Sequence, residues 1–185
     1  MKAVLISINP LWCELIGNGE KTIEVRKNRP KLKTPFKVFI YCTKAKTDGE
    51  YLWTAKSTTI GKMADVANGK VIGEFICDKV IEELPNPRYE KLLNGSCLDN
   101  DTLINYGKFG ILYGWHISNL KLYDVLKDLK EFYKECKGGC GNVCKHGRYI
   151  RVNADEYDMD CDCDGLIPIT KPPQSWCYVE YYGAK

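Results

Sequence analysis

Residues 7–26 read SINPLWCELIGNGEKTIEVR, and this stretch decides how the chain begins to fold. Asn9 followed by Pro10 predicts the start of a helix, because Asn caps helices and proline suits the first helical position. Residues 17–19, GNG, predict its end, since Gly and Asn tolerate a positive φ. We therefore expect a capped helix, a tight turn and then a short strand over residues 22–26.

Most of the remaining chain has the pattern of β-strands. Besides residues 22–26, we expect strands at residues 2–8, 37–43, 70–84, 111–123 and 176–182. Short helices are expected within residues 87–106, and an amphipathic helix over residues 124–136. One early helix without alternation of strands and helices favours an α+β fold built on a small mixed β-barrel. We expect a single domain over residues 1–185, with residues 136–164 as an insertion before the last strand.

The composition is that of an ordinary globular protein. The chain has 185 residues, of which 44% are hydrophobic and 28% are charged, which excludes a disordered chain, a collagen and a coiled coil. No apolar run approaches the roughly 18 residues that a membrane helix needs, and the first residues lack the apolar core of a signal peptide. We expect a cytoplasmic protein without a membrane partner.

The charge is unevenly distributed along the chain. Residues 1–46 carry ten basic and three acidic residues, whereas the rest carries seventeen basic and twenty-one acidic residues. A basic N-terminal third can attract phosphate groups. A solvated surface of mixed charge gives the same counts, so the charge pattern leaves both interpretations open.

A compact polar cluster is expected where the helix passes into the second strand. Thr22, Glu24 and Arg26 share one face of that strand, and Lys21 lies at the turn before it. A lysine, a carboxylate and an arginine so close together could bind an anion or a nucleobase edge, or move a proton. The alternative is a surface strand with alternating charge.

Glu74 is a second candidate for function. In the strand over residues 70–84, the even positions place this carboxylate between Ile72 and Ile76, on an apolar face. A carboxylate buried there needs a partner or a raised pKa, and both are common at functional sites. The alternative is an edge position from which Glu74 reaches solvent.

Several of these motifs resemble the ASCH family, which belongs to the PUA-like β-barrels. The similarity lies first in SINP at residues 7–10, the apolar helix, and GEKTIEVR at residues 19–26. The strands KVFIYCTK, GKVIGEFICDKV and YGWHISNL and the closing PPQSWCYVE are also similar, and PPQSW resembles a bacterial and phage subgroup. The resemblance covers roughly residues 1–125 and 168–183. It implies a partly open, PUA-like mixed β-barrel with the helix at one end.

The resemblance also implies a cleft lined by lysine, glutamate and arginine, and the superfamily is linked to RNA binding. We therefore expect a module that binds RNA or a modified nucleotide. Trp12 is the best candidate for stacking on a base, because it lies one turn after Asn9. The residues expected to bind the ligand are Ser7, Trp12, Lys21, Glu24, Arg26 and Lys44.

Some bacterial members of this superfamily hydrolyse the amide of N-acylated cytidine with a Lys, a Thr and a Glu. Here Lys21 matches the Lys and Glu74 matches the Glu, whereas Glu24 stands at the Thr position. A carboxylate there pairs with Lys21 or Arg26 more readily than it acts as a nucleophile, which favours binding. An amidohydrolase that uses Lys21, Glu24 and Glu74 stays open, as does a protein-interaction module.

Cysteine is unusually frequent in one stretch. Five of the ten cysteines fall within 28 residues, together with a histidine: Cys136, Cys140, Cys144, His146, Cys161 and Cys163. Four such ligands make a closed tetrahedral zinc site, so we expect a structural zinc ion bound by four of these six residues. The spacings differ from the common pair of cysteines separated by two residues. Disulfides, unmodified thiols and an iron–sulfur cluster therefore remain alternatives.

Overall fold

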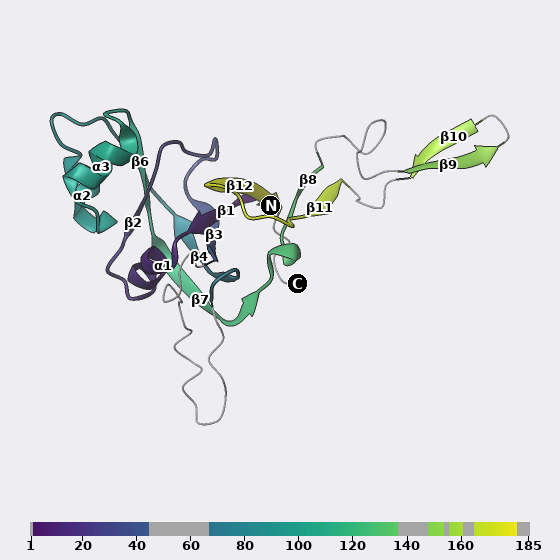
Figure 1. Ribbon diagram of the computed structural model, residues 1–185, viewed down its shortest axis with the longest axis horizontal. Coiled ribbons are helices and arrows are strands. Elements are labelled where there is room, and N and C mark those ends of the chain that lie inside the picture. Colours follow the sequence, from purple (N-terminus) through teal and green to yellow (C-terminus); the bar gives the residue numbers. More distant parts are fainter. Residues whose placement is uncertain (1, 45–66, 137–147, 154–155, 161–164, 181–185) are drawn as a thin grey trace, which may run out of the picture.

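The structure is a computed structural model that describes residues 2–44, 67–136, 148–153, 156–160 and 165–180 (Figure 1). Within these residues the strands form a seven-stranded sheet, a three-stranded sheet and a separate two-stranded hairpin. No helix in this part of the chain is long and apolar enough to cross a membrane.

The seven-stranded sheet has the order β11-β8-β12-β1-β3-β4-β7. Its strands are β1 (Lys2–Ile8), β3 (Phe36–Cys42), β4 (Val71–Cys77), β7 (Ser118–Lys127), β8 (Tyr133–Glu135), β11 (Leu166–Pro168) and β12 (Trp176–Glu180). β1 runs parallel to β3 and antiparallel to β12. Because β1 lies between two strands and is buried on both faces, its sequence is a nearly continuous apolar run.

The two faces of this sheet pack against separate apolar cores. Alternate residues such as Val4, Ile6 and Ile40 lie in what we call the first core. Their neighbours along the strands, such as Leu5 and Phe39, lie in the second core. The period-2 alternation of strands thus assigns each side chain of β1 and β3 to one of two environments.

The three-stranded sheet is antiparallel and has the order β2-β6-β5. Its strands are β2 (Ile23–Arg26), β6 (Leu112–His116) and β5 (Val80–Glu83). Two short helices pack on one face, α2 (Glu90–Ser96) and α3 (Asn100–Gly107), as Figure 1 shows. They form a third core with the sheet: Ile23, Val25, Tyr89, Leu92, Leu103 and Leu112. The short helices expected within residues 87–106 are confirmed.

Two of the predicted long strands each divide between the sheets. The strand expected over residues 70–84 is interrupted at Asp78 and Lys79, which separate β4 from β5. The strand expected over residues 111–123 is interrupted at Ile117, which separates β6 from β7. β4 pairs with β7, and β5 pairs with β6. Both segments of the chain therefore pass from one sheet to the other at the same corner, as strands do where two sheets close toward a barrel.

Helix α1 (Pro10–Gly17) forms where the sequence predicts it. The Asn9 side chain accepts a hydrogen bond from the Leu11 amide at 3.0 Å, which caps the helix. Cys13 and Ile16 of α1 are buried in the first core. The helix therefore covers one side of the seven-stranded sheet, as expected for a helix at one end of the barrel.

The prediction of an amphipathic helix over residues 124–136 is wrong. β7 continues to Lys127, which pairs with Val71 of β4. A 3-10 turn (Leu129–Glu131) and strand β8 follow. Backbone pairing with a distant strand here overrides the local helical periodicity, as tertiary context often does.

A hairpin lies between β8 and β11, within the stretch where the sequence analysis places an insertion. It consists of β9 (Arg148–Asn153) and β10 (Glu156–Asp160), which pair antiparallel. The chain then returns through β11 to β12, the predicted closing strand, which pairs with β1.

Candidate functional site

Strand β2 presents its polar side chains to the inside of the fold. Ile23 and Val25 point into the third core beneath α2. Glu24 therefore points to the opposite face, where it lies directly across from Trp115 of β6. Arg26 follows on the same face, and Lys21 precedes the strand in the turn after α1.

We call Lys21, Glu24 and Arg26 the β2 cluster. Glu24 Oε1 lies 2.6 Å from Arg26 Nη1, and Glu24 Oε2 lies 3.5 Å from Lys21 Nζ. Lys21 is 2% exposed and Glu24 is 3% exposed. Lysine and glutamate are almost never buried to this extent without a partner, so the three charges form a single buried ionic group.

The β2 cluster holds several elements together. Lys21 Nζ donates a hydrogen bond to the Ser96 carbonyl at the end of α2, at 2.5 Å. The same nitrogen lies 5.2 Å from the centre of the Trp12 ring on α1, within cation–π range. Arg26 Nη2 donates to the Ser7 carbonyl of β1 at 2.7 Å. The predicted ligand-binding residues Ser7, Trp12, Lys21, Glu24 and Arg26 thus lie together.

Ser7 joins the cluster through its backbone rather than its side chain. Its hydroxyl donates a hydrogen bond to the Pro173 carbonyl at 2.7 Å, in the segment that leads to β12. Its carbonyl oxygen is the group that orients Arg26. Ser7 is therefore placed to position the arginine, and its hydroxyl secures the closing segment.

The electrostatic state of Lys21 follows from its burial. Burial lowers the pKa of the Lys21 ammonium, because desolvation penalises the charged form, and the nearby Glu24 and Cys97 oppose this shift. The amine of Lys21 is thus easier to deprotonate than that of a surface lysine. A lysine of this kind can serve as a cation for an anionic ligand or exchange a proton with one.

Three buried polar atoms near β2 lack a hydrogen-bond partner among the described residues: Glu24 Oε2, Arg26 Nε and Trp115 Nε1. Among the described residues, these three are the buried side-chain nitrogen and oxygen atoms that lack a hydrogen-bond partner. Glu24 and Trp115 are paired across β2 and β6, so these atoms belong to one face of the small sheet. A buried polar atom left unpaired costs about 1–3 kcal/mol. A polar ligand that pairs with these atoms would recover that energy.

Aromatic residues pack beside the β2 cluster. Trp115 is fully buried and makes edge contacts with the rings of Phe36 and Trp176, each with centroids 5.8 Å apart. Trp176 Nε1 donates to Asn28 Oδ1 at 2.7 Å. The closing sequence motif therefore fixes the loop that follows β2. Trp115 and Trp176 act in packing here, whereas Trp12 is half-buried and contacts Lys21.

Glu74 does not lie with Lys21. Its Oε1 lies 2.8 Å from Lys37 Nζ, and its Oε2 accepts a hydrogen bond from the Tyr123 hydroxyl at 2.7 Å. Glu74 pairs across the sheet with Phe39, a residue of the second core. Trp12, which contacts Lys21, packs against the first core. The structure therefore places Glu74 on the other face of the seven-stranded sheet and does not bring it together with Lys21.

A register irregularity explains this difference. The pairing of β3 with β4 shifts between Ile40 and Tyr41, so that Ile40 pairs with Gly73 but Tyr41 pairs with Val71. The extra residue, Ile72, breaks the strict alternation of faces. Glu74 and Ile76 consequently face the side of the second core, whereas Ile72 faces the first core.

The pKa of Glu74 lies below its usual value. Partial burial works to raise this pKa, but the hydrogen bonds from Lys37 and Tyr123 and the Lys37 charge outweigh burial. Both carboxylate oxygens have close partners. We call Lys37, Glu74 and Tyr123 the β4 cluster, and its bonding is that of a stable ion pair.

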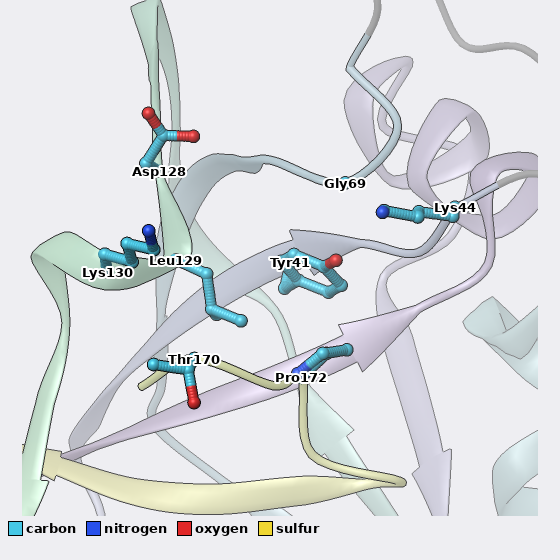
Figure 2. Close-up of a pocket in the computed structure, with 8 residues that line it drawn as sticks. All are labelled: Tyr41, Lys44, Gly69, Asp128, Leu129, Lys130, Thr170 and Pro172. Atoms are coloured by element: carbon cyan, nitrogen blue, oxygen red, sulfur yellow. The ribbon is translucent and has the colours of Figure 1, made fainter. Parts of the chain in front are cut away.

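Lys44 lies in a separate pocket, shown in Figure 2. This open pocket has a volume of about 370 Å³ and is lined by Tyr41, Lys44, Gly69, Asp128, Leu129, Lys130, Thr170 and Pro172. Tyr41 belongs to the second core, and no lining residue belongs to the β2 cluster. Lys44 follows the end of β3 by two residues. Its pocket shares no lining residue with the β2 cluster, so the structure separates Lys44 from the other predicted ligand-binding residues.

Five of the six predicted zinc ligands lie outside the described residues: Cys140, Cys144, His146, Cys161 and Cys163. Cys136 is described, and its amide donates a hydrogen bond to the Gly165 carbonyl. Among the described residues, no group of three or more His, Cys, Asp or Glu side chains could hold a metal ion. The zinc site remains a prediction.

Two contributions to the site could not be found from the sequence. The Ser96 carbonyl contacts Lys21 across 75 positions of the chain. Gly95 has a φ of +89°, and a Cβ there would collide with Thr22 Oγ1. The Gly95 carbonyl accepts a hydrogen bond from the Thr22 amide, so this glycine lets α2 close over the turn that carries Lys21. In the sequence, Gly95 indicates a turn at this position, but it does not indicate a contact with Thr22.

Known proteins resemble this chain in structure, at low sequence identity. No family model and no curated protein matches the chain. The ASCH protein from Zymomonas mobilis has a similar structure, with a TM-score of 0.50 and 17% identity over 70% of this chain and 77% of that chain. A serine-to-alanine mutant of that protein aligns with a TM-score of 0.56 and 15% identity over 96% of this chain and 88% of the other.

A tyrosine-to-phenylalanine mutant of the same Zymomonas mobilis protein aligns with a TM-score of 0.50 and 15% identity, over 70% of this chain and 77% of that chain. At such identities the likeness concerns the fold. The chain has an α+β fold similar to that of the Zymomonas mobilis ASCH protein.

Proposed function

We propose that the protein binds RNA or a modified nucleotide through the β2 cluster. The observation that carries this proposal is Glu24 Oε2, which is buried and makes no hydrogen bond of good geometry among the described residues, its one close donor being Lys21 Nζ at 3.5 Å. A carboxylate oxygen can accept a hydrogen bond from the exocyclic amine of a base. Lys21 and Arg26 supply positive charge for the phosphate or for polar base edges.

We place the entrance of this site at Trp12. Trp12 is half-buried at the edge of α1, and Lys21 Nζ lies over its ring. An aromatic face beside a buried cation and a carboxylate suits a base that stacks and forms hydrogen bonds at its edge. The ligand would gain hydrogen bonds that the unliganded protein leaves unmade.

Titration of a labelled single-stranded RNA, followed by fluorescence anisotropy, tests this function. Lys21→Ala and Arg26→Ala should each weaken binding at least tenfold and lower the salt slope by about 1. Lys37→Ala is the matched control, because Lys37 also pairs with a glutamate but lies in the β4 cluster. Circular dichroism and Lys21→Arg, which keeps the charge, separate misfolding from lost contacts. Equal binding by all variants would contradict the proposal.

An amidohydrolase acting on N-acylated cytidine is the second candidate, and the lowered pKa of Lys21 favours it. Neutral Lys21 would take a proton from a water molecule, which Glu24 would orient, as the water oxygen bonds to the amide carbon. The C–N bond would then break, and the proton would pass to the leaving amine. Glu74, which lies in the β4 cluster, would have no part.

Incubation with N-acetylated cytidine separates the two candidates. Deacylation shifts the ultraviolet absorbance of the base. Turnover that Lys21→Ala abolishes would identify an enzyme and would place Lys21 in the chemistry. No turnover, together with RNA binding that depends on Lys21, would establish the binding function.

A further inference from the structure

Apolar side chains are unusually exposed around the end of α3. Tyr106, Phe109 and Ile111 are 36%, 68% and 43% exposed. Tyr106 lies in the last turn of α3, and Phe109 and Ile111 lie in the segment that joins α3 to β6, beside the small sheet in Figure 1. We call these three residues, with Lys27 and Lys108, the α3 corner. An exposed phenylalanine contributes little to a core, so packing does not account for it.

The backbone that carries these side chains is firmly held. The hydroxyl of Tyr89, which is fully buried, donates a hydrogen bond to the Gly110 carbonyl at 2.5 Å. The Gly110 amide donates to the Gly107 carbonyl at 3.0 Å, and the Lys108 amide donates to the Ile104 carbonyl at 2.7 Å. The turn therefore presents Phe109 from a fixed position rather than from a loose loop.

Two consecutive residues of this turn adopt a conformation that side chains disfavour. Lys108 has a φ of +53° and Phe109 has a φ of +60°. In the left-handed region a bulky residue is strained, whereas Gly or Asn is tolerated. A strained, solvent-exposed aromatic residue held by its surroundings is the kind of feature that gathers at binding sites.

Positive charges lie among these aromatic side chains. Lys27 Nζ lies 4.9 Å from the centre of the Tyr106 ring, and Lys108 directly precedes Phe109. The acidic residue of α3, Asp101, is in its first turn, at the other end of the helix. Aromatic faces interleaved with cations bind single-stranded nucleic acid, whereas the centres of protein–protein interfaces are depleted of lysine.

We propose that the α3 corner is a second binding surface for single-stranded nucleic acid. Bases stack on Phe109 and Tyr106, and Lys27 and Lys108 contact phosphates. This inference rests on the proposed function, because β2 joins the two surfaces: Arg26 of the β2 cluster is followed directly by Lys27. The two surfaces lie on opposite sides of the small sheet, so a nucleic-acid strand held at both passes around its edge strand, β2.

Anisotropy titrations with a labelled single-stranded RNA of about a dozen nucleotides test the α3 corner. Phe109→Asn removes the aromatic face and keeps a residue that tolerates the left-handed turn, so the variant should fold. Phe109→Asn and Tyr106→Leu should each weaken binding by about 5- to 150-fold. Val125→Asn is the control, because Val125 is 79% exposed on β7, and it should bind as the wild type does.

A mononucleotide titration separates this inference from the proposed function. Phe109→Asn should bind the mononucleotide as the wild type does, whereas Lys21→Ala should lose it. RNA binding by Phe109→Asn as tight as that of the wild type would overturn the α3 corner and leave the β2 cluster standing. A protein partner lost in Phe109→Asn while RNA affinity stays unchanged would also overturn it, in favour of protein docking. Wild-type protein that binds neither probe would overturn both proposals.

Discussion

The β2 cluster and the β4 cluster each join a glutamate to a lysine, but the carboxylate oxygens of the two glutamates differ in their hydrogen-bond partners. In the β4 cluster both oxygens of Glu74 have close partners, and its side chain is 18% exposed. In the β2 cluster Glu24 Oε2 is buried, and among the described residues it has the Lys21 ammonium at 3.5 Å and no hydrogen bond of good geometry. A fully satisfied cluster contributes to structure, whereas a partly satisfied buried cluster costs stability until a ligand completes it.

Removal of the zinc ion predicted for the Cys-rich stretch carries the largest expected effect. We expect about one zinc ion per chain by elemental analysis, with a binding free energy on the order of 10 kcal/mol. A chelator should lower the melting temperature and leave RNA binding at the β2 cluster intact. Metal-free protein whose stability does not change in chelator would remove the zinc site.

Breaking one charge pair in each cluster tests the difference in burial. Arg26→Met removes the 2.6 Å partner of Glu24 and leaves a buried carboxylate, which should cost about 3–5 kcal/mol. Lys37→Met removes a partner from the more exposed Glu74 and should cost about 1 kcal/mol. Urea unfolding measures both values. A larger loss of unfolding free energy for Lys37→Met than for Arg26→Met would contradict the claim that the β2 cluster is the more buried of the two.

Replacing the whole β2 cluster tests whether its charges serve binding rather than folding. The triple variant Lys21→Met, Glu24→Leu, Arg26→Met leaves no buried charge unpaired and should be more stable than Arg26→Met, although the Ser96 and Ser7 carbonyls lose their donors. It should bind no RNA. A triple variant less stable than Arg26→Met would show that the ionic group is structural.

The β4 cluster should contribute to stability in a pH-dependent way, with the smallest of these effects. The lowered pKa of Glu74 means that its contribution is present above the unfolded value, about 4.5, and is lost as pH falls through the lower folded value. After screening we expect about 1 kcal/mol or less. Glu74→Gln should reduce the loss of urea stability between neutral and acidic pH. An unchanged pH dependence would mean that the pair contributes nothing.

The sequence was sufficient where structure is decided locally. The Asn9 cap, the turn after α1 and the alternation of β2 all follow from near neighbours in the chain. These features are also the ones that bring Lys21, Glu24 and Arg26 together, so most of the candidate site could be predicted from residues 7–26.

The errors arise where distant strands decide the structure. The shift of register at Ile40 and Tyr41 turns Glu74 toward the second core, and no local pattern reveals it. Pairing of β7 with β4 replaces the helix expected over residues 124–136. The contact of Lys21 with Ser96 joins residues 75 positions apart. Such long-range contacts follow from the closed fold rather than from the pattern of any segment.

Two matched substitutions test the central claim most directly. Glu24→Gln and Glu74→Gln each replace a carboxylate oxygen with an amide nitrogen of nearly the same size, one in each cluster. Calorimetric titration of each variant with the same single-stranded RNA compares them under identical conditions. Glu24→Gln should weaken binding at least tenfold, about 1.4 kcal/mol, and Glu74→Gln should leave it unchanged. Equal affinity for both variants would contradict the assignment of the ligand site to the β2 cluster.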